Sequence, residues 1–246
     1  MSLPLRLTVV AAVFVAFSGC DAKPAQQDGV PGGASGESAA LDPRAVELMQ
    51  VGLNVHNFYD KHKRIPLDIK SPDGTPLLSW RVELLEVLDP ALYQQFHLQE
   101  AWDSPHNSKL MAKVPRWYAS VPGKESDGQT TVMMFNGPKT AFQNPNATMW
   151  FAGITDGLAN TILAVESGPD KAVPWTKPAD LTLDPAAPLA AVGQTPDTGM
   201  LALFYDGQVR LISDMVPPAD LAAMVTATGG ETVVFDYAPS VRAGKK

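Results

Sequence analysis

The order of sequence patterns in residues 42 to 246 predicts an α+β domain in which an N-terminal helix packs on an antiparallel sheet. Three observations support this class. Helical periodicity is concentrated at the start of the region, and short runs of branched and aromatic residues follow it. Two of these runs are joined by Asp206-Gly207, a pair that is typical of a β-hairpin. About 200 residues are enough to bury one sizeable core.

The first expected element is an amphipathic helix from Pro43 to His62. Its apolar arc consists of Ala45, Leu48, Val51, Gly52, Val55, Phe58 and Tyr59, with polar side chains on the opposite arc. Asp42 is suited to cap the helix, and the proline after it presets the first turn. Two shorter helices are expected next, one from Thr75-Pro76 to Leu88 and one from Asp89-Pro90 to about Phe96.

Strands are expected in the second part of the domain. The runs are Thr131 to Phe135, Thr148 to Phe151, Thr161 to Val165, Met200 to Tyr205, Val209 to Ile212 and Thr232 to Tyr237. The Asp206-Gly207 pair predicts a two-residue type I′ turn. In that register one face of the hairpin carries Met200, Ala202, Phe204, Val209 and Leu211, and this face is the better core candidate.

The stretch from Gly168 to Gly199 is rich in proline and has no clear periodicity, so it is expected to be a long loop. A loop of this length in a compact domain is typically either functional or disordered. A partner surface is therefore expected here, formed by Trp175, Lys177, Pro178 and Asp180.

Residues 1 to 19 are predicted to be a lipoprotein-type signal peptide. Arg6 precedes an apolar run from Leu7 to Phe17, which at about 11 residues is too short to span a hydrocarbon core of roughly 30 Å. The segment Phe17-Ser-Gly-Cys20 resembles the lipobox of bacterial lipoprotein signals, which implies that the Cys20 sulfur receives a diacylglycerol group. An ordinary secretory signal is the alternative.

Residues 20 to 41 are predicted to be a flexible tether, because this segment is rich in Gly, Ala, Ser, Pro and Gln and has no aromatic residue. Its end-to-end distance is about 25 Å. The protein is therefore expected to be exported and anchored to the cytoplasmic or outer membrane, with residues 42 to 246 as a domain facing the periplasm or the exterior.

The charge of the chain limits its partners. The 26 acidic and 19 basic side chains give a net charge of -7, which repels phosphate backbones and anionic headgroups. Nucleic-acid binding is not expected, and attachment to a membrane must come from the acyl chains at Cys20 rather than from basic side chains.

Six short motifs occur along the domain. They are Leu53-Asn-Val-His56-Asn57-Phe-Tyr-Asp60, Leu77-Leu-Ser-Trp80-Arg81, Trp102-Asp-Ser-Pro-His106-Asn107, Ile154-Thr-Asp156-Gly157-Leu-Ala-Asn160-Thr161-Ile162, Val173-Pro-Trp175-Thr-Lys-Pro178 and Phe204-Tyr-Asp206-Gly207-Gln-Val-Arg210. In this order they resemble a planctomycete paralogous domain of unknown function, a family also described as prepilin-associated H-x9-DG and solute-binding-like. The resemblance implies a pilin-like fold, with a long helix on an antiparallel sheet. Pro196 stands where the family motif has histidine.

No catalytic, cofactor or metal site is expected. The chain contains no GxSxG, HExxH, Walker or GxGxxG motif. His56 and His62 are about 120° apart on a helix and would not converge on a metal, and His106 lies in a sequence typical of a turn. The five tryptophans are suited either to a core or to a platform for stacking a sugar.

Two functions remain open. The favoured one is a lipid-anchored, extracytoplasmic, pilin-like structural or interaction module with an unknown envelope protein as its partner. The alternative is an extracytoplasmic solute-binding lipoprotein, with glycans among the candidate ligands.

Overall fold

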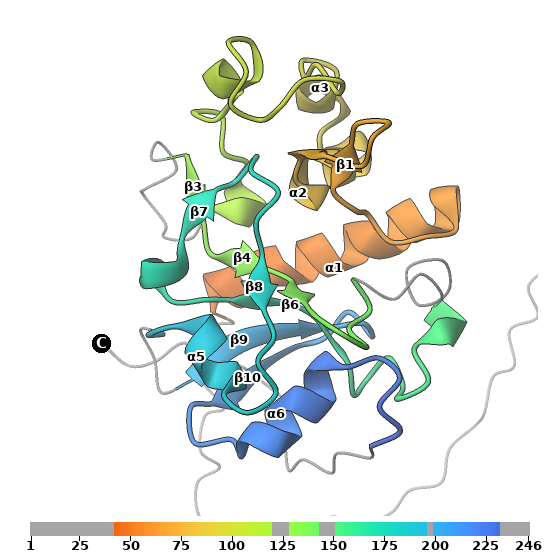
Figure 1. The fold of residues 1–246 in the computed structure, drawn as a ribbon, viewed down its shortest axis with the longest axis vertical. Coiled ribbons are helices and arrows are strands. Elements are labelled where there is room, and N and C mark those ends of the chain that lie inside the picture. Colours follow the sequence, from red (N-terminus) through yellow and green to blue (C-terminus); the bar gives the residue numbers. More distant parts are fainter. Residues whose placement is uncertain (1–41, 120–127, 143–150, 196–198, 232–246) are drawn as a thin grey trace, which may run out of the picture. The chain divides into compact units, whose positions relative to one another are not determined.

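The computed structural model describes residues 42–119, 128–142, 151–195 and 199–231 (Figure 1). The α-helices are α1 (Pro43–His62), α2 (Trp80–Leu88), α3 (Pro90–Tyr93), α5 (Pro188–Val192) and α6 (Pro218–Val225). The strands are β1 (Ile69–Lys70), β2 (Pro76–Leu78), β3 (Gln129–Thr130), β4 (Val132–Met133), β5 (Phe135–Asn136), β6 (Ile162–Glu166), β7 (Val173–Pro174), β8 (Leu181–Thr182), β9 (Gly199–Phe204) and β10 (Val209–Ser213). Four 3-10 helices complete the description: η1 (Asn107–Leu110), η2 (Arg116–Tyr118), η4 (Phe151–Gly153) and η5 (Pro169–Lys171).

Helix α1 has the bounds that the sequence predicts. The side chain of Asp42 accepts a hydrogen bond from the backbone N–H of Arg44 at 2.9 Å and so caps the first turn. At the other end Lys63 has a φ of 56°, and its N–H donates to the Tyr59 carbonyl oxygen. Both ends are thus determined by local interactions.

The main sheet is antiparallel in the order β10-β9-β6-β4, which confirms the α+β class. Both of its faces are buried. Leu201, Leu203 and Val209 join the core that contains the inner arc of α1, whereas Met200, Phe204 and Ile212 pack in a second core with residues of α6. Figure 1 shows α1 and α6 on opposite sides of β9 and β10.

The hairpin between β9 and β10 is confirmed, but its turn differs from the expected one. The Phe204 N–H donates to Gln208 O, and positive φ occurs at Gly207 (+81°) and not at Asp206. A type I′ turn needs positive φ at both central residues, so this is instead a three-residue loop ending in a left-handed glycine. The extra residue moves the register by one, and Val209 pairs with Leu203.

The register shift corrects the expected distribution of side chains. Val209 lies on the α1 side of the sheet and not on the face of Met200, Ala202 and Phe204. Leu211 was expected in the core and is 45% exposed. Strand β9 is therefore buried along both faces, whereas β10 contributes one buried side chain to each core, Val209 to the first and Ile212 to the second.

The second helix begins later than expected. Pro76–Leu78 form β2, which pairs with β1, and α2 starts only at Trp80. Ser79 has an extended backbone, and its side chain accepts a hydrogen bond from Arg81 N, so Ser79 rather than Thr75 is the N-cap. The third helix is confirmed as a short one, capped by Asp89.

The segment from Gly168 to residue 195 is not the long structureless loop that the sequence suggested. It contains η5, β7, β8 and α5, and its backbone is bonded to distant segments. The N–H of Leu181 donates to Met134 O, and that of Trp175 donates to Gly128 O. These non-local hydrogen bonds order a segment whose own sequence has no periodicity.

Several predictions fall outside the described residues. They are the signal peptide, the tether and Cys20, the position of Pro196, most of the expected strand Thr148 to Phe151 and the whole of Thr232 to Tyr237. Of that first strand only Phe151 is described, and it lies in η4. Within the described ranges, none of the helices has the length and apolar character needed to cross a bilayer.

Helix α1 approaches the sheet most closely at Gly52. A Cβ atom placed on this residue would lie 2.8 Å from Leu203 Cδ1 and 3.5 Å from Gly207 Cα. A glycine in the middle of a helix costs about 1 kcal/mol relative to alanine. Its position here is explained by the contact between helix and strand.

The loop geometry predicts the effect of replacing Gly207. Gly207→Ala should lower the free energy of unfolding by about 1 kcal/mol, because alanine is strained at positive φ while nothing lies within 4 Å of the added Cβ. Gly207→Asn is the matched control and should lose less, since asparagine tolerates this conformation. Equal stabilities of the wild type and the alanine variant in urea unfolding would contradict the described turn.

Candidate functional site

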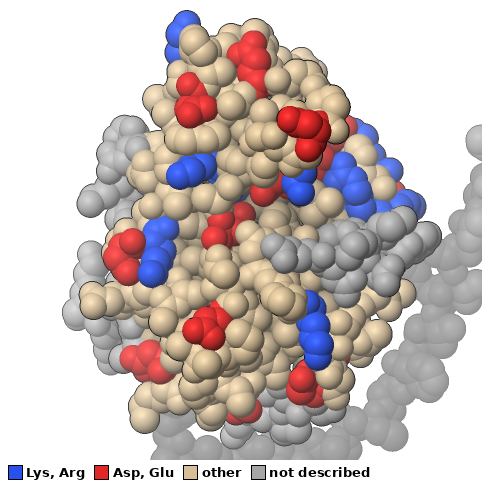
Figure 2. Space-filling model, in the orientation of Figure 1, with Lys and Arg blue, Asp and Glu red and all other residues tan. Residues whose placement is uncertain are grey.

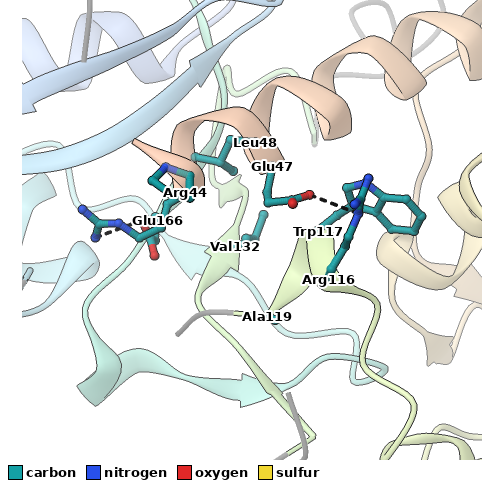
Figure 3. A pocket seen from close by; sticks show the side chains of 9 residues that line it. Arg44, Glu47, Leu48, Arg116, Trp117, Ala119, Val132 and Glu166 are labelled. Carbon is teal, nitrogen blue, oxygen red and sulfur yellow. Dashed lines mark ion pairs between the residues drawn. The ribbon is translucent and has the colours of Figure 1, made fainter. Parts of the chain in front are cut away.

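A cleft of about 180 Å³ opens beside the first turns of α1 (Figure 3). Helix α1 contributes one wall, η2 and Ala119 another, and β4 and the end of β6 complete it. The lining residues are Pro43, Arg44, Glu47, Leu48, Arg116, Trp117, Ala119, Val132 and Glu166. Arg44, Glu47 and Leu48 face the same side because residues three and four apart are neighbours on a helix.

Two ion pairs cross the cleft, and they differ in strength. Arg44 is held firmly, since its Nη2 lies 2.8 Å from Asp42 Oδ2 and its Nη1 lies 3.4 Å from Glu166 Oε2. Arg116 is held loosely, with its Nε 3.6 Å from Glu47 Oε2 and its side chain 70% exposed. Figure 3 shows Arg44 beside Glu166 and Arg116 beside Glu47 as two separate pairs.

Glu47 Oε2 is the polar atom of the cleft whose hydrogen bonding is incomplete. It is buried, and among the residues that the structure describes it has no hydrogen-bond donor within reach, because Arg116 stays at 3.6 Å. The Arg116 guanidinium also lies over the Trp117 ring, with Cζ 5.4 Å from the ring centroid. A carboxylate and an aromatic face therefore meet at one place, and a cation suits both.

A second polar cluster lies in the interior and is built on Arg81 and Asp180. Both side chains are 0% exposed, and Arg81 Nη2 lies 2.8 Å from Asp180 Oδ1. The carboxylate also accepts hydrogen bonds from Trp80 Nε1 and from the backbone N–H of Met134. Burial raises the pKa of Asp180, and the Arg81 guanidinium opposes this shift.

Asp68 belongs to the same cluster. Its Oδ1 accepts a hydrogen bond from Trp80 N at 2.9 Å. Burial, together with the nearby charge of Asp180, raises the pKa of Asp68 to about 6. This carboxyl group therefore changes its charge at a pH well above the usual range of an aspartate.

The expected partner surface at Trp175, Lys177, Pro178 and Asp180 is corrected by burial for two of its four members. Trp175 is 0% exposed, and its Nε1 donates to Met111 O at 2.9 Å. The Asp180 side chain is buried against Arg81. Lys177 and Pro178 are half-buried, and Lys177 Nζ lies 5.5 Å from the Trp102 ring centroid. The side chains of Trp175 and Asp180 thus belong to the interior, and those of Lys177 and Pro178 lie at its edge.

The histidines do not converge on a metal. His56 Nε2 is bonded to Tyr205 O, His62 pairs with Glu86, and the rings of His97 and His106 stack with centroids 3.4 Å apart. Stacked rings point their nitrogens sideways rather than at a common point. Over the ranges with assigned positions, no group of three or more His, Cys, Asp or Glu residues is arranged to hold a metal ion.

Two polar residues of the sequence motifs, Asn107 and Asp156, hydrogen-bond to the backbone of loops. The buried Asn107 side chain donates to the carbonyl oxygens of His97, Glu100 and Ala101 and accepts from His97 N. Asp156 accepts from the N–H groups of Gly229 and Gly230. These side chains supply hydrogen bonds to loops that lack a regular ladder.

The sequence did not single out the cleft. No local sequence feature distinguishes Trp117 from the other tryptophans. Trp80 and Trp175 are buried, and Trp150 is outside the described residues. The spacing of Arg44, Glu47 and Leu48 on α1 was a usable signal for one wall. Arg116 and Glu166 reach the cleft only through the tertiary fold.

Charges elsewhere on the surface are mixed. Figure 2 shows acidic and basic side chains interspersed over the visible face, often side by side, rather than gathered into one basic or acidic patch. On that face the fold gives no extended single-sign surface. The cleft combines accessible charges with an apolar lining and is the candidate functional site.

The fold and the site define an α+β domain with a small charged cleft. Residues 46–149 match a family whose description is protein of unknown function (DUF1559). The matched range contains Glu47, Arg116 and Trp117 but not Glu166 or Asp180. No curated protein and no solved structure matches the chain.

Removing one partner of the buried ion pair should destabilise the fold strongly. Asp180→Ala should cost about 3–5 kcal/mol, because it leaves the Arg81 guanidinium buried without its counter-charge. The double variant Arg81→Met with Asp180→Leu should recover much of this loss. Asp214→Ala, at an exposed aspartate, is the control and should stay within about 0.5 kcal/mol. A loss below 1 kcal/mol for Asp180→Ala in denaturant unfolding would contradict the role of the pair.

The raised pKa of Asp68 makes stability depend on pH. Between about pH 4 and 6 the folded state binds more protons at Asp68 than the unfolded state, so the free energy of unfolding falls as the pH rises. The shift from 3.8 to about 6 corresponds to a loss of about 3 kcal/mol.

Asp68→Asn removes this titration while keeping an acceptor for Trp80 N. Relative to this variant, the wild type should become less stable between pH 4 and pH 7.5. Urea unfolding of both proteins at the two pH values measures the difference. If the difference in the free energy of unfolding between wild type and Asp68→Asn is the same at both pH values, the pKa of Asp68 is not raised in the folded state.

Proposed function

We propose that this protein is a lipid-anchored, extracytoplasmic interaction module built on a pilin-like domain, and that it acts by binding rather than by catalysis. The lipobox at Cys20 and the polar segment up to residue 41 support the anchor and the tether. The long α1 on an antiparallel sheet is compatible with a pilin-like arrangement. The observation that carries the binding role is the cleft beside α1.

The distribution of polar groups favours binding over chemistry. Arg81 and Asp180, the most deeply buried charges, are 0% exposed and cannot reach a substrate from solvent. In the cleft the accessible charged side chains are paired with each other. The apolar part of the cleft lining consists of Leu48, Val132 and Trp117. An apolar lining with a few charged groups is typical of a recognition site.

A solute-binding lipoprotein is the second candidate, and the dimensions of the cleft are compatible with it if the solute is small. A volume of about 180 Å³ is below the roughly 300 Å³ at which drug-sized ligand pockets begin, so it suits a small solute or a single side chain. Trp117 offers an aromatic surface at its edge. The two candidates differ in whether the ligand is free or part of a partner.

The anchor is tested by replacing Cys20. Wild-type protein should incorporate a labelled fatty acid and sediment with membranes, whereas Cys20→Ala should do neither, because the only thiol of the chain is lost. Ser18→Ala keeps a small residue before the cysteine and is the matched control. Equal labelling and equal sedimentation of wild type and Cys20→Ala would refute the lipid anchor.

A further inference from the structure

Among the residues that the structure describes, three acidic and two basic side chains lie around the cleft. Asp42, Glu47 and Glu166 are acidic, and Arg44 and Arg116 are basic. Arg44 has two bonds to Asp42, from its Nε and its Nη2, in addition to the contact with Glu166. Three contacts fix the position of the Arg44 guanidinium. Arg44 is therefore the counter-charge of Asp42 and Glu166, and Arg116 is the basic side chain that pairs with Glu47.

The pair between Glu47 and Arg116 is the weak one. The 3.6 Å separation exceeds hydrogen-bond distance, and the Arg116 side chain is 70% exposed. An ion pair with one solvent-exposed partner and no hydrogen bond contributes little to stability, and salt screens the charge of the exposed partner. Displacing Arg116 into solvent therefore costs little, whereas the buried Glu47 oxygen would gain a donor.

We infer that the cleft binds an alkyl cation, an ammonium or guanidinium group on an apolar stem, and that Arg116 occupies the place of this cation when no ligand is bound. The inference rests on the proposed binding role of the cleft and specifies its ligand. The ligand's charge replaces the Arg116 guanidinium at Glu47 and over Trp117. Its stem lies along Leu48 and Val132, as the methylene groups of lysine do on apolar surfaces.

Two further properties agree with this ligand. The cleft has room for one extended side chain or a small amine, not for a larger molecule. The chain carries a net charge of -7, so its field attracts cations and repels anions during encounter. The same chemistry occurs in free amines and in the lysine or arginine side chains of a partner polypeptide.

The test is a titration of the full chain in detergent micelles, followed through the indole resonance of Trp117, which is assigned with Trp117→Phe. The probes are 1,4-diaminobutane, capped lysine, capped arginine and capped norleucine, which has the stem without the charge. Methyl β-glucoside serves as a neutral sugar. Capped lysine and arginine should shift the resonance saturably, and capped norleucine and the glucoside should not.

Two variants give opposite expectations. Glu47→Gln should weaken binding of capped lysine at least tenfold, because the counter-charge is lost. Arg116→Ala should strengthen it severalfold, since the competing cation is removed. Lys109→Ala removes an exposed cation outside the cleft and is the control for net charge. Dispersed amide resonances show that each variant is folded. Glu47→Asp keeps the negative charge but moves it away from the cleft by one methylene group, so it should bind capped lysine with intermediate affinity.

The outcomes separate the possibilities. Tighter binding of diaminobutane than of capped lysine identifies a free amine as the ligand, and the reverse order identifies a basic side chain. Binding of norleucine or the glucoside as tight as that of lysine, or weaker binding after Arg116→Ala, would overturn the inference. If the wild type binds no cation but Cys20 is lipidated, the inference fails alone and the anchored module remains.

Discussion

The buried contact between Arg81 and Asp180 connects segments that no regular ladder joins. Arg81 belongs to α2, and Asp180 immediately precedes β8. The backbone N–H of Met134, at the break between β4 and β5, donates to the Asp180 carboxylate. A side chain thus takes the place of a strand partner for Met134, and this hydrogen bond offsets part of the desolvation cost of the buried charge pair.

Two hydrogen bonds connect Arg81 to residues that form the cleft or lie next to it. Arg81 Nε donates to the carbonyl oxygen of Val132, which lines the cleft, and the Tyr118 hydroxyl donates to Arg81 O. Tyr118 ends the short helix η2 that carries Arg116 and Trp117. Two walls of the cleft therefore depend on the position of Arg81, although Arg81 itself does not line the cleft.

The sequence predicted the elements that local interactions determine. Helix α1 was identified with its bounds because its periodicity, its aspartate cap and its proline all lie within the helix or next to it. The loop at Gly207 is one residue longer than the sequence predicts, since Asp-Gly fits both two-residue and three-residue loops. That one residue decided which side chains of β10 meet α1.

Non-local elements were predicted less well. The prolines between residues 168 and 195 suggested a loop, while the hydrogen bonds that order it come from Gly128, Met134 and Asn136 far away in the chain. For the candidate site, only the helical wall is encoded in a local spacing. The sequence suggests a surface position for Trp175 and Asp180, because their own sequence neighbourhood does not show that Met111 and Arg81 lie beside them.

The absence of a Cβ atom at Gly52 affects the position of the helix that forms one wall of the cleft. The Leu203 side chain occupies the notch that Gly52 leaves, so α1 cannot slide along β9 without a steric collision. Arg44 and Glu47 on that rigid helix are therefore held in register with Glu166 on the neighbouring strand β6 before any ligand arrives. For the proposed ligand this wall of the cleft is already formed, so the affinity would not be reduced by the entropy of ordering the α1 backbone.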